Sequence, residues 1–399
     1  MRITAILGVC GLLAAQTRTV SDEEVMRVHR SALLIDTHND VTSATVEGLD
    51  IGPRRSTGHT DIARMRQGGL GAQFFAVFVA ASYVNGNRSA HRALEMIDTV
   101  KHDIAARYPD TFEFVTTAAG IEAAYRKGKI AALMGIEGGH AIEDSLRLLR
   151  AFHDLGIRYM TLTHSNTNNW ADSSGDVTRP NVKHHDGLTG FGKEVVREMN
   201  RLGMMVDISH VADKTFWDAL EASAAPVFAS HSSCRALSNI PRNMTDEMIR
   251  AVAKKGGVVQ INFGCEFLSQ KSADASPWSN PRLSAKLEEG RSAGKDPQQA
   301  RAEMKKLMAE MGVKMPRATL ADAVAHIDHI VKIAGVDAAG IGSDFDGVQC
   351  VPEGLDDVSQ FPNLTRALLQ KGYRAEDIRK FYGGNLLRVM RAVEQTARH

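Results

Sequence analysis

The sequence predicts an α/β protein that folds as a (β/α)8 TIM-type barrel, and three observations point to this fold. Eight short apolar runs recur along the 399 residues. Between them lie longer segments with the periodicity of amphipathic helices, which is the pattern of parallel βαβ units. Most of the runs also end in polar residues, as barrel strands do where they build a site. Eight such units in a chain of this length favour a closed barrel over an open, doubly wound sheet.

The predicted strands are apolar runs that are too short to form helices. In chain order they are residues 31–40, 71–80, 129–139, 158–165, 204–210, 226–232, 257–263 and 338–347. In the segments between them, apolar residues return every three or four positions and therefore share one helix face. The clearest predicted helices are residues 142–155, 192–202, 245–255 and 320–334.

Two stretches exceed what a minimal barrel needs. Residues 84–125 form a long helical passage between the second and third strands, and residues 266–317 are polar and rich in Ser, Lys and Glu. The second stretch is predicted as a helical insertion after the seventh strand, where loops lie at the mouth of a barrel. It is either a solvent-exposed addition to the barrel surface or an active-site lid. We expect residues 21–399 to form a single domain that includes this insertion.

Residues 1–20 are predicted to be a signal peptide. Arg2 precedes an apolar run at residues 3–15 and polar residues follow, a layout too short to span a bilayer as a mature helix. A misplaced start codon or a buried N-terminal helix are the alternatives. We expect export to the periplasm or the medium, and a cytoplasmic protein if this segment is not a signal. Removal of the leader would leave Cys234, Cys265 and Cys350, which allow at most one disulfide.

Composition narrows the possible partners. Lys and Arg number 48 against 47 Asp and Glu, so the chain lacks the basic excess of nucleic-acid-binding proteins, and we expect no nucleic-acid partner. The polar C-terminal residues 394–399 do not resemble a GPI signal, so no stable membrane anchor is expected. The 15 histidines are the unusual feature, because imidazole is the commonest metal ligand.

Potential metal ligands lie at the ends of six of the eight predicted strands. They are His38 and Asp40, Glu137, His164, His210, His231 and Asp344. The carboxyl ends of barrel strands meet on one face, so we expect these side chains to lie together. A lone histidine at a strand end is more often structural than a ligand, and it is the coincidence of the whole set that predicts a metal site. The histidines in predicted helices and loops, His59, His91, His102, His153, His184, His185, His326, His329 and His399, are expected to be exposed or to cap helices.

The donor set predicts two divalent ions. Imidazole and carboxylate ligands suit zinc or a related ion. One ion needs only three protein ligands plus water, and this set is larger. Two ions about 3.5–4 Å apart, bridged by a carboxylate, would use all of the ligands and would activate water at neutral pH. Glu137, midway along the series, is the natural bridge.

Several motifs in a fixed order resemble the membrane (renal) dipeptidase family of binuclear zinc peptidases. They are IDTHND at 35–40, GIEGGH at 135–140, LTHSNTN at 162–168, DISH at 207–210, SHSSCRAL at 230–237, RN at 242–243, GIGSDFDG at 340–347 and GGNLLRV at 383–389. The resemblance covers nearly the whole mature chain. It implies that His38, Asp40 and Glu137 bind one zinc ion and that Glu137, His210 and His231 bind a second.

The same resemblance implies roles for three further residues. Asp344 matches the acid that takes a proton from the bridging water and passes it to the leaving amine. His164 matches the imidazole that contacts the substrate carbonyl. Arg242 matches the guanidinium that holds the terminal carboxylate, and its planar fork suits that partner. Relatives are often dimeric and commonly accept a D-residue at the C-terminal position, so a homodimer and tolerance of D-residues are expectations here.

The leading hypothesis is therefore a zinc-dependent dipeptidase that acts on small dipeptides. One alternative is an amidohydrolase-type enzyme for a cyclic amide, a lactone or an N-acyl amino acid. A second alternative is a barrel retained as a non-catalytic binding or maturation protein. Barrels that have lost catalytic activity normally also lack some of the metal ligands. All of the expected ligands are present in this sequence.

Overall fold

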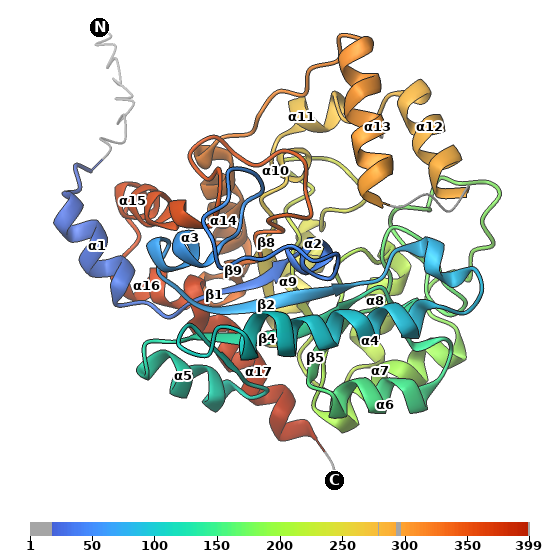
Figure 1. Ribbon diagram of the computed structural model, residues 1–399, viewed down its shortest axis with the longest axis horizontal. Helices are drawn as coiled ribbons and strands as arrows, with labels where there is room; N and C mark the ends of the chain where they lie inside the picture. Colours follow the sequence, from blue (N-terminus) through green and yellow to red (C-terminus); the bar gives the residue numbers. More distant parts are fainter. Residues whose placement is uncertain (1–17, 278, 293–296, 398–399) are drawn as a thin grey trace, which may run out of the picture.

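The chain folds as a nearly closed barrel of eight parallel strands, as the sequence predicted. The computed structural model describes residues 18–397 apart from 278 and 293–296. The barrel strands follow one another in the order β1-β2-β4-β5-β6-β7-β8-β9 (Figure 1). They are β1 (Leu34–Asn39), β2 (Leu70–Phe78), β4 (Ile130–Glu137), β5 (Ile157–Thr161), β6 (Met205–Asp207), β7 (Phe228–Ala229), β8 (Val258–Ile261) and β9 (Ala339–Ile341).

The last strand returns to the first just beyond its end. The Asp344 N–H donates to the His38 carbonyl at 3.1 Å, and the Asp40 N–H donates to the Phe345 carbonyl at 2.9 Å. These two bonds bring the chain after β9 against the end of β1. Residues more than 300 positions apart in sequence therefore become neighbours at the barrel mouth.

Each predicted run coincides with one barrel strand, although β2 and β5 begin one residue before their runs, and the sequence analysis missed β3 (Phe112–Phe114). This strand pairs with β4 off the path of the barrel and lies in the passage that was predicted to be wholly helical. Three residues are too few to show a strand periodicity, so only the neighbouring strand reveals it.

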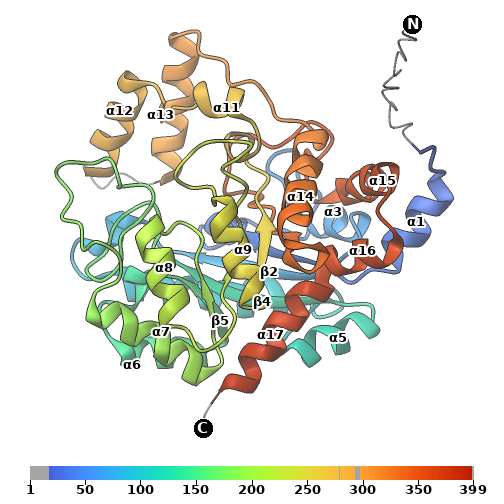
Figure 2. The ribbon, with the colours of Figure 1, turned by 180° about the vertical axis from the view of Figure 1, so that it is seen from behind.

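Helices surround the strands (Figures 1 and 2). Those that cover the barrel are α4 (Ser89–Thr99), α5 (Ala118–Arg126), α6 (Leu146–Asp154), α7 (Gly190–Leu202), α8 (Asp213–Ala222), α9 (Asp246–Lys254), α14 (Leu320–Ala334) and α17 (Asn385–Thr396). Others include α1 (Asp22–Arg30), α2 (Thr42–Thr45), α3 (Ile62–Gln67), α15 (Phe361–Lys371) and α16 (Ala375–Arg379). None of the helices among the described residues is both long and apolar enough to cross a bilayer.

The four clearest predicted helices are present, and one begins later than expected. Helix α6 starts at Leu146 rather than at residue 142, because Glu143 and Asp144 have φ angles of 46° and 55°. The left-handed backbone at these two residues ends the short turn at Gly139–Ile142 and separates that turn from the helix. Helix α14 has the predicted bounds and begins with a capping box between Thr319 and Asp322.

Successive side chains of each strand point to opposite faces of the sheet, and this divides the core into two layers. On β4, Ala131 and Leu133 pack in the cluster that fills the barrel, whereas Ala132 and Met134 pack in the cluster shared with the outer helices. Helices α5 and α17 complete the inner cluster at the end away from the mouth (Figures 1 and 2). Side chains alternate with a period of two, so Glu137 lies on the inward face with Ala131 and Leu133.

The stretch after β8 forms four helices that stand above the barrel in Figure 1. They are α10 (Cys265–Leu268), α11 (Gln270–Asp274), α12 (Pro281–Ser292) and α13 (Pro297–Glu310). A disulfide joins Cys265, the first residue of α10, to Cys350 in the loop that follows β9. Cys234 is free and buried, so the three cysteines that the structure describes form one disulfide. The predicted signal peptide lies almost wholly outside the described residues.

Candidate metal centre

The structure brings all seven candidate ligands together at the carboxyl ends of the barrel strands. His38 and Asp40 come from the end of β1, Glu137 is the last residue of β4, and the others follow β5, β6, β7 and β9. Their donor atoms form three groups in which all of the atoms lie within 4.8 Å of one another. The groups are His38, Glu137 and His231; Glu137, His164 and His210; and His38, Asp40 and Asp344.

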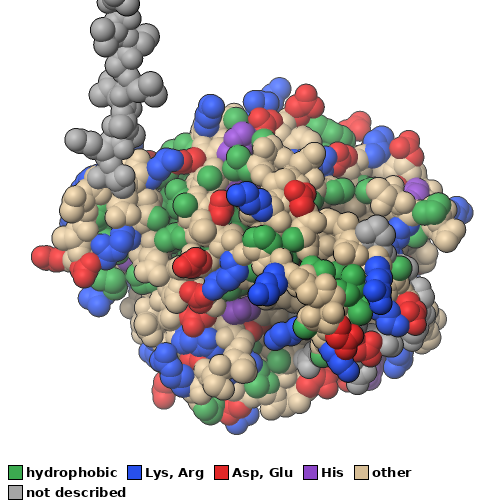
Figure 3. Space-filling model, turned by 90° about the horizontal axis from the view of Figure 1, so that it is seen from above, with side chains coloured by type: hydrophobic (Ala, Val, Ile, Leu, Met, Phe, Trp, Pro, Cys, Tyr) green, Lys and Arg blue, Asp and Glu red, His purple; other side chains and the backbone are tan. Residues whose placement is uncertain are grey.

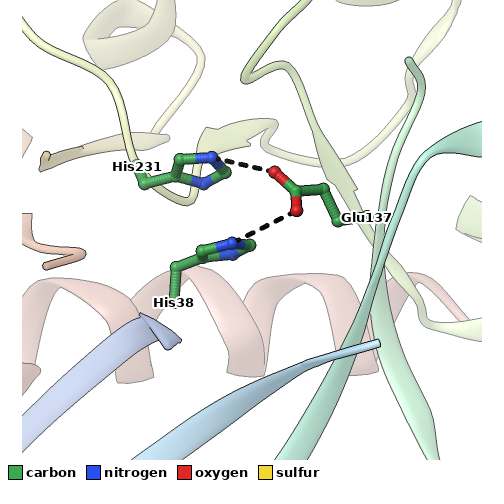
Figure 4. A group of neighbouring side chains, drawn as sticks. All are labelled: His38, Glu137 and His231. Carbon is green, nitrogen blue, oxygen red and sulfur yellow. Dashed lines mark ion pairs between the residues drawn. The ribbon is translucent and has the colours of Figure 1, made fainter. Parts of the chain in front are cut away.

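The Glu137 carboxylate lies at the centre of this arrangement. Its Oε2 is 3.5 Å from His38 Nε2, and its Oε1 is 3.2 Å from His231 Nε2 (Figure 4). The same Oε1 lies 2.9 Å from His210 Nε2 and 3.8 Å from His164 Nε2. The two carboxylate oxygens thus face different sets of imidazoles. This is the geometry that a bridging carboxylate requires.

Hydrogen bonds behind His231 fix the direction of its lone pair. Ser230 Oγ donates to Asp207 Oδ2 at 2.6 Å and lies 2.7 Å from His231 Nδ1. The serine hydroxyl has only one proton, so it accepts from His231 Nδ1–H. The Nε2 atom of His231 then carries a lone pair that points at Glu137. Outer partners of this kind orient metal-binding histidines in many proteins.

His38 is oriented in the same way by Tyr159. The Tyr159 hydroxyl donates to the Thr37 carbonyl at 3.0 Å and lies 2.9 Å from His38 Nδ1. It therefore accepts from His38 Nδ1–H and leaves Nε2 as the acceptor. That Nε2 is buried and has no hydrogen-bond partner. A buried imidazole nitrogen without a partner is costly unless a cation or a proton satisfies it.

Several observations indicate that the residues fit a divalent ion. His210 Nε2 and His231 Nε2 lie 3.0 Å apart, and burial, with a smaller effect of nearby positive charge, holds the pKa of both histidines well below the usual range. Two unprotonated nitrogens and a carboxylate oxygen at this spacing repel one another unless a cation lies between them. Ligands at about 2.0–2.1 Å from a tetrahedral zinc ion are about 3.3 Å apart, which agrees with the distances around Glu137.

His38 lies in a strongly negative environment. Burial disfavours charge on its imidazole, but Tyr159, Glu137 and Asp40 outweigh burial and raise the pKa of His38 well above its usual value. Asp40 Oδ2 lies 3.2 Å from His38 Nε2. The negative charge that attracts a proton to His38 also attracts a metal cation. The side of the site formed by His38 and Asp40 therefore suits a positive ion as well.

Asp344 lies beside the cluster in a strained backbone conformation. Burial, together with the neighbouring Asp40 carboxylate, raises the pKa of Asp344 to about 7. Asn262 Nδ2 donates to its Oδ2 at 2.7 Å. Asp344 has a φ of 60° and His210 a φ of 67°, values that non-glycine residues rarely adopt. Strained residues with shifted pKa values gather at functional sites.

Arg242 is a partly buried cation next to these candidate ligands. Its Nη1 donates to Ser232 Oγ at 2.6 Å and its Nη2 donates to the His231 carbonyl at 2.7 Å. The Phe267 ring lies under the guanidinium at 5.6 Å, and Nε has no hydrogen-bond partner. Among the residues that the structure describes, no carboxylate pairs with Arg242. The arrangement leaves this cation available for an anionic ligand.

A cavity of about 650 Å³ opens beside His210 and Arg242. This volume is in the range of small-molecule sites. One wall is the loop at 165–182, and another comes from the insertion through Glu266, Phe267, Ala273, Ser276 and Ser284. The insertion is therefore more than a solvent-exposed addition to the barrel surface, because part of it lines the cavity. Figure 3 looks onto this face, where acidic and basic side chains are interspersed.

Sequence reasoning missed the residues that support the cluster. Tyr159 and Asn262 lie inside predicted strands, and nothing in the sequence distinguishes them from core residues. His326, which was expected to be exposed or to cap a helix, is fully buried. Its Nδ1 accepts from the Cys234 N–H, and its Nε2 lies 3.0 Å from the Leu268 carbonyl. The helical periodicity of α14 places His326 on the inward face, which is the signal that could have predicted its burial.

The family model for membrane dipeptidase (peptidase family M19) matches residues 22–399. The chain belongs to the membrane dipeptidase family. An uncharacterized dipeptidase of Schizosaccharomyces pombe is 33% identical over 401 residues, which cover 96% of this chain and 85% of that protein. This confirms the resemblance drawn from the motifs.

Solved structures agree with this assignment. The probable dipeptidase PvdM from Pseudomonas aeruginosa is 25% identical, with a TM-score of 0.79 over 94% of this chain and 98% of that chain. A metallopeptidase from Rhodobacter sphaeroides, liganded with a phosphinate mimic of the dipeptide L-Ala-D-Ala, is 25% identical. Its TM-score is 0.74 over 91% of this chain and 99% of that chain. The chain is therefore an enzyme, a metal-dependent dipeptidase on a TIM-type barrel.

Proposed function

We propose that this protein hydrolyses the peptide bond of dipeptides with two zinc ions. In this proposal His38, Asp40 and Glu137 hold one ion, and Glu137, His210 and His231 hold the other. The observation that carries the proposal is the Glu137 carboxylate, which presents one oxygen to His38 and the other to His210 and His231. Other divalent ions with similar ligand preferences are alternatives to zinc.

Ions held by these residues would activate a water for attack and polarise the scissile carbonyl. The remaining tasks belong to the protein. His164 lies 3.8 Å from Glu137 Oε1 and packs against Phe78, where its imidazole can donate to the carbonyl oxygen as negative charge develops. Asp344, with its pKa near neutrality, accepts a proton from the attacking water and returns it to the departing nitrogen.

Arg242 is proposed to bind the C-terminal carboxylate of the substrate. Its guanidinium is partly buried beside the candidate metal ligands and donates only to neutral oxygens of the described protein. A carboxylate ligand would provide the missing negative charge and accept two hydrogen bonds from the planar fork. This restricts substrates to molecules with a free carboxylate close to the scissile bond.

We also propose that a D-residue is accepted at the C-terminal position. Support comes from the Rhodobacter sphaeroides relative, which was solved with a mimic of L-Ala-D-Ala. Assays of metal-analysed protein on L-Ala-L-Ala, L-Ala-D-Ala and Gly-D-Phe would test this. Hydrolysis of the L,L compound alone would contradict tolerance of D-residues and leave the dipeptidase assignment intact.

The same preparation separates the alternative functions. We expect about two metal ions per chain and hydrolysis of dipeptides above that of lactones, cyclic amides and N-acyl amino acids. Hydrolysis of lactones, cyclic amides or N-acyl amino acids without hydrolysis of dipeptides would favour the alternative amidohydrolase-type function. A protein that binds no metal and turns over none of the compounds would favour a binding or maturation role.

Export and dimer formation stay proposals that rest on sequence. We expect the secreted protein to lack residues 1–20, which N-terminal sequencing of the mature chain would reveal. Light scattering of the purified protein would test the homodimer. A cytoplasmic protein that retains Met1 would contradict export.

A further inference from the structure

Glu266 is a carboxylate on the wall of the substrate cavity. It lies in the first turn of α10, next to Phe267, whose ring packs against Arg242. Both residues line the same cavity as Arg242 and His210. The Glu266 carboxylate forms no hydrogen bond or ion pair with any described residue, and only its backbone carbonyl has a partner, the hydroxyl of Ser238.

The position of Glu266 is fixed from both sides. The preceding residue, Cys265, is joined to Cys350 by the disulfide, and its N–H donates to the Cys350 carbonyl at 3.0 Å. The Glu266 carbonyl accepts from Ser238 Oγ at 2.7 Å. A carboxylate on a backbone held this firmly is a preorganised binding group, since little conformational entropy is lost when a ligand reaches it.

The charges around the cavity do not neutralise Glu266. Arg179, the other arginine on the wall, pairs with Asp176 at 3.2 Å. Burial, with a smaller contribution from the nearby Asp344 carboxylate, raises the pKa of Glu266 to about 7. No described residue therefore supplies positive charge next to Glu266, and a bound cation would favour the ionised carboxylate.

Among the described residues that line the cavity, Arg242 is thus a cation without an ion-pair partner and Glu266 a carboxylate without one. A ligand that satisfies both groups carries a carboxylate and a positively charged nitrogen. We infer that Glu266 forms a subsite for a positively charged nitrogen of the substrate, so that it helps to select which dipeptides bind. This inference rests on the proposed dipeptidase function and deepens it.

The nitrogen has two possible sources in a dipeptide. One is the α-ammonium group at its N-terminus, and the other is the side chain of a C-terminal Lys or Arg. Either would form a charge-assisted hydrogen bond with the carboxylate in a partly buried site. Hydrogen bonds to charged groups contribute enough to change affinity by about 10–100-fold.

Wild-type holoenzyme and Glu266→Gln should be compared on four compounds. L-Ala-L-Lys and L-Ala-L-norleucine differ in the charge of the C-terminal side chain. L-Ala-L-Ala and N-propionyl-L-alanine differ in the α-amino group, and the second can be measured as an inhibitor if it is not hydrolysed. Glutamine keeps the shape of Glu266 and removes its charge. Glu289→Gln, which removes an exposed carboxylate from α12 of the same insertion, is the matched control.

We expect Glu266→Gln to weaken one of these discriminations by about 10–100-fold in kcat/KM or inhibition constant. A reduced preference for Lys over norleucine identifies the side chain as the ligand. A loss confined to compounds with a free α-amino group identifies the N-terminus. Glu289→Gln should change neither ratio.

The inference would be overturned by a Glu266→Gln enzyme that still hydrolyses dipeptides and keeps both the preference for Lys over norleucine and the preference for a free α-amino group. Glu266→Asp, which retains the charge on a shorter side chain, should keep part of the discrimination, and equal behaviour of Asp and Gln variants would also argue against it. Metal content and thermal unfolding of each variant separate a binding defect from misfolding. Failure of the wild-type enzyme to hydrolyse any dipeptide would instead contradict the proposed function.

Discussion

His210 and His231 face each other with their Nε2 atoms 3.0 Å apart. Glu137 Oε1 lies 2.9 Å from the first and 3.2 Å from the second. Burial disfavours a proton on either ring, so three electron-rich atoms share a small space. We therefore expect metal removal to destabilise the protein. Chelation should lower the thermal unfolding temperature, and excess zinc should restore it, since an ion at 100 times its Kd contributes about 2.7 kcal/mol per site.

Glu137→Gln offers a sharper version of this test. The amide can donate a bond where the carboxylate only accepts, and it cannot bridge two cations. Bound metal should fall below two ions per chain. A variant that keeps both ions, measured by elemental analysis, would contradict the bridging assignment of Glu137.

Asp344→Asn should separate proton transfer from metal binding. The amide cannot accept a proton, so kcat should fall by about 10²–10⁴, the usual contribution of general acid–base catalysis. Metal content should stay unchanged, because the five proposed ligands are intact. Full activity of Asp344→Asn on dipeptides would show that another group moves the proton.

Arg242→Ala should mainly raise KM for dipeptides. The guanidinium is proposed to hold the terminal carboxylate and not to contact the atoms that react. A hydrogen-bonded charge pair of this kind corresponds to about 10–100-fold in affinity. Arg250→Ala, which removes a half-exposed arginine from α9, is the control and should leave KM unchanged. A large fall in kcat at constant KM would place Arg242 in the chemical step.

The Cys265–Cys350 disulfide should contribute to stability, because it closes a loop across a sequence separation of 85. The loop-entropy model gives about 4–5 kcal/mol as an upper value. Urea unfolding should shift to lower concentration when a reductant is present. The double variant Cys265→Ala/Cys350→Ala should already be shifted and should not respond to the reductant. Equal midpoints with and without reductant in the natural sequence would contradict the bond.

His326 should make stability depend on pH. Burial lowers the pKa of His326 to about 4, against about 6.5 in an unfolded chain. Between these values the unfolded chain binds more protons, so the free energy of unfolding falls as pH decreases from 6.5 to 4 and changes no further below that. The loss is roughly 3 kcal/mol.

The variant His326→Asn tests this assignment, because its side-chain oxygen can still accept from the Cys234 N–H. The free energy of unfolding, measured in urea at several pH values, should fall less steeply for the variant between pH 6.5 and 4. His140, whose pKa burial also lowers to about 4, and other histidines with lowered pKa values, such as His29, should contribute to the slope that is left. If the free energy of unfolding depends on pH in the same way for the two proteins, His326 is not a source of that dependence.

Much of the fold and the candidate site was predictable because both depend on repeating patterns. Each barrel strand is an apolar run, and parallel strands must end on the same face. That rule is enough to gather His38, Glu137 and His231 from distant parts of the sequence, and the structure places their donor atoms within 4.8 Å of one another. The family followed from motifs in which these residues occur.

Other features depend on contacts that leave no local pattern. The hydrogen bond of Tyr159 to His38 crosses the barrel between residues 121 positions apart. The three residues of β3 become a strand only because β4 lies beside them.

The sequence by itself determined the barrel, the order of its strands and the polar residues at their ends, because hydrophobic periodicity and strand direction are local properties. Only the tertiary structure decided which cysteines pair, which way each imidazole points and that Glu266 faces the cavity without a cation. Those outcomes depend on side-chain packing between segments that the sequence keeps far apart.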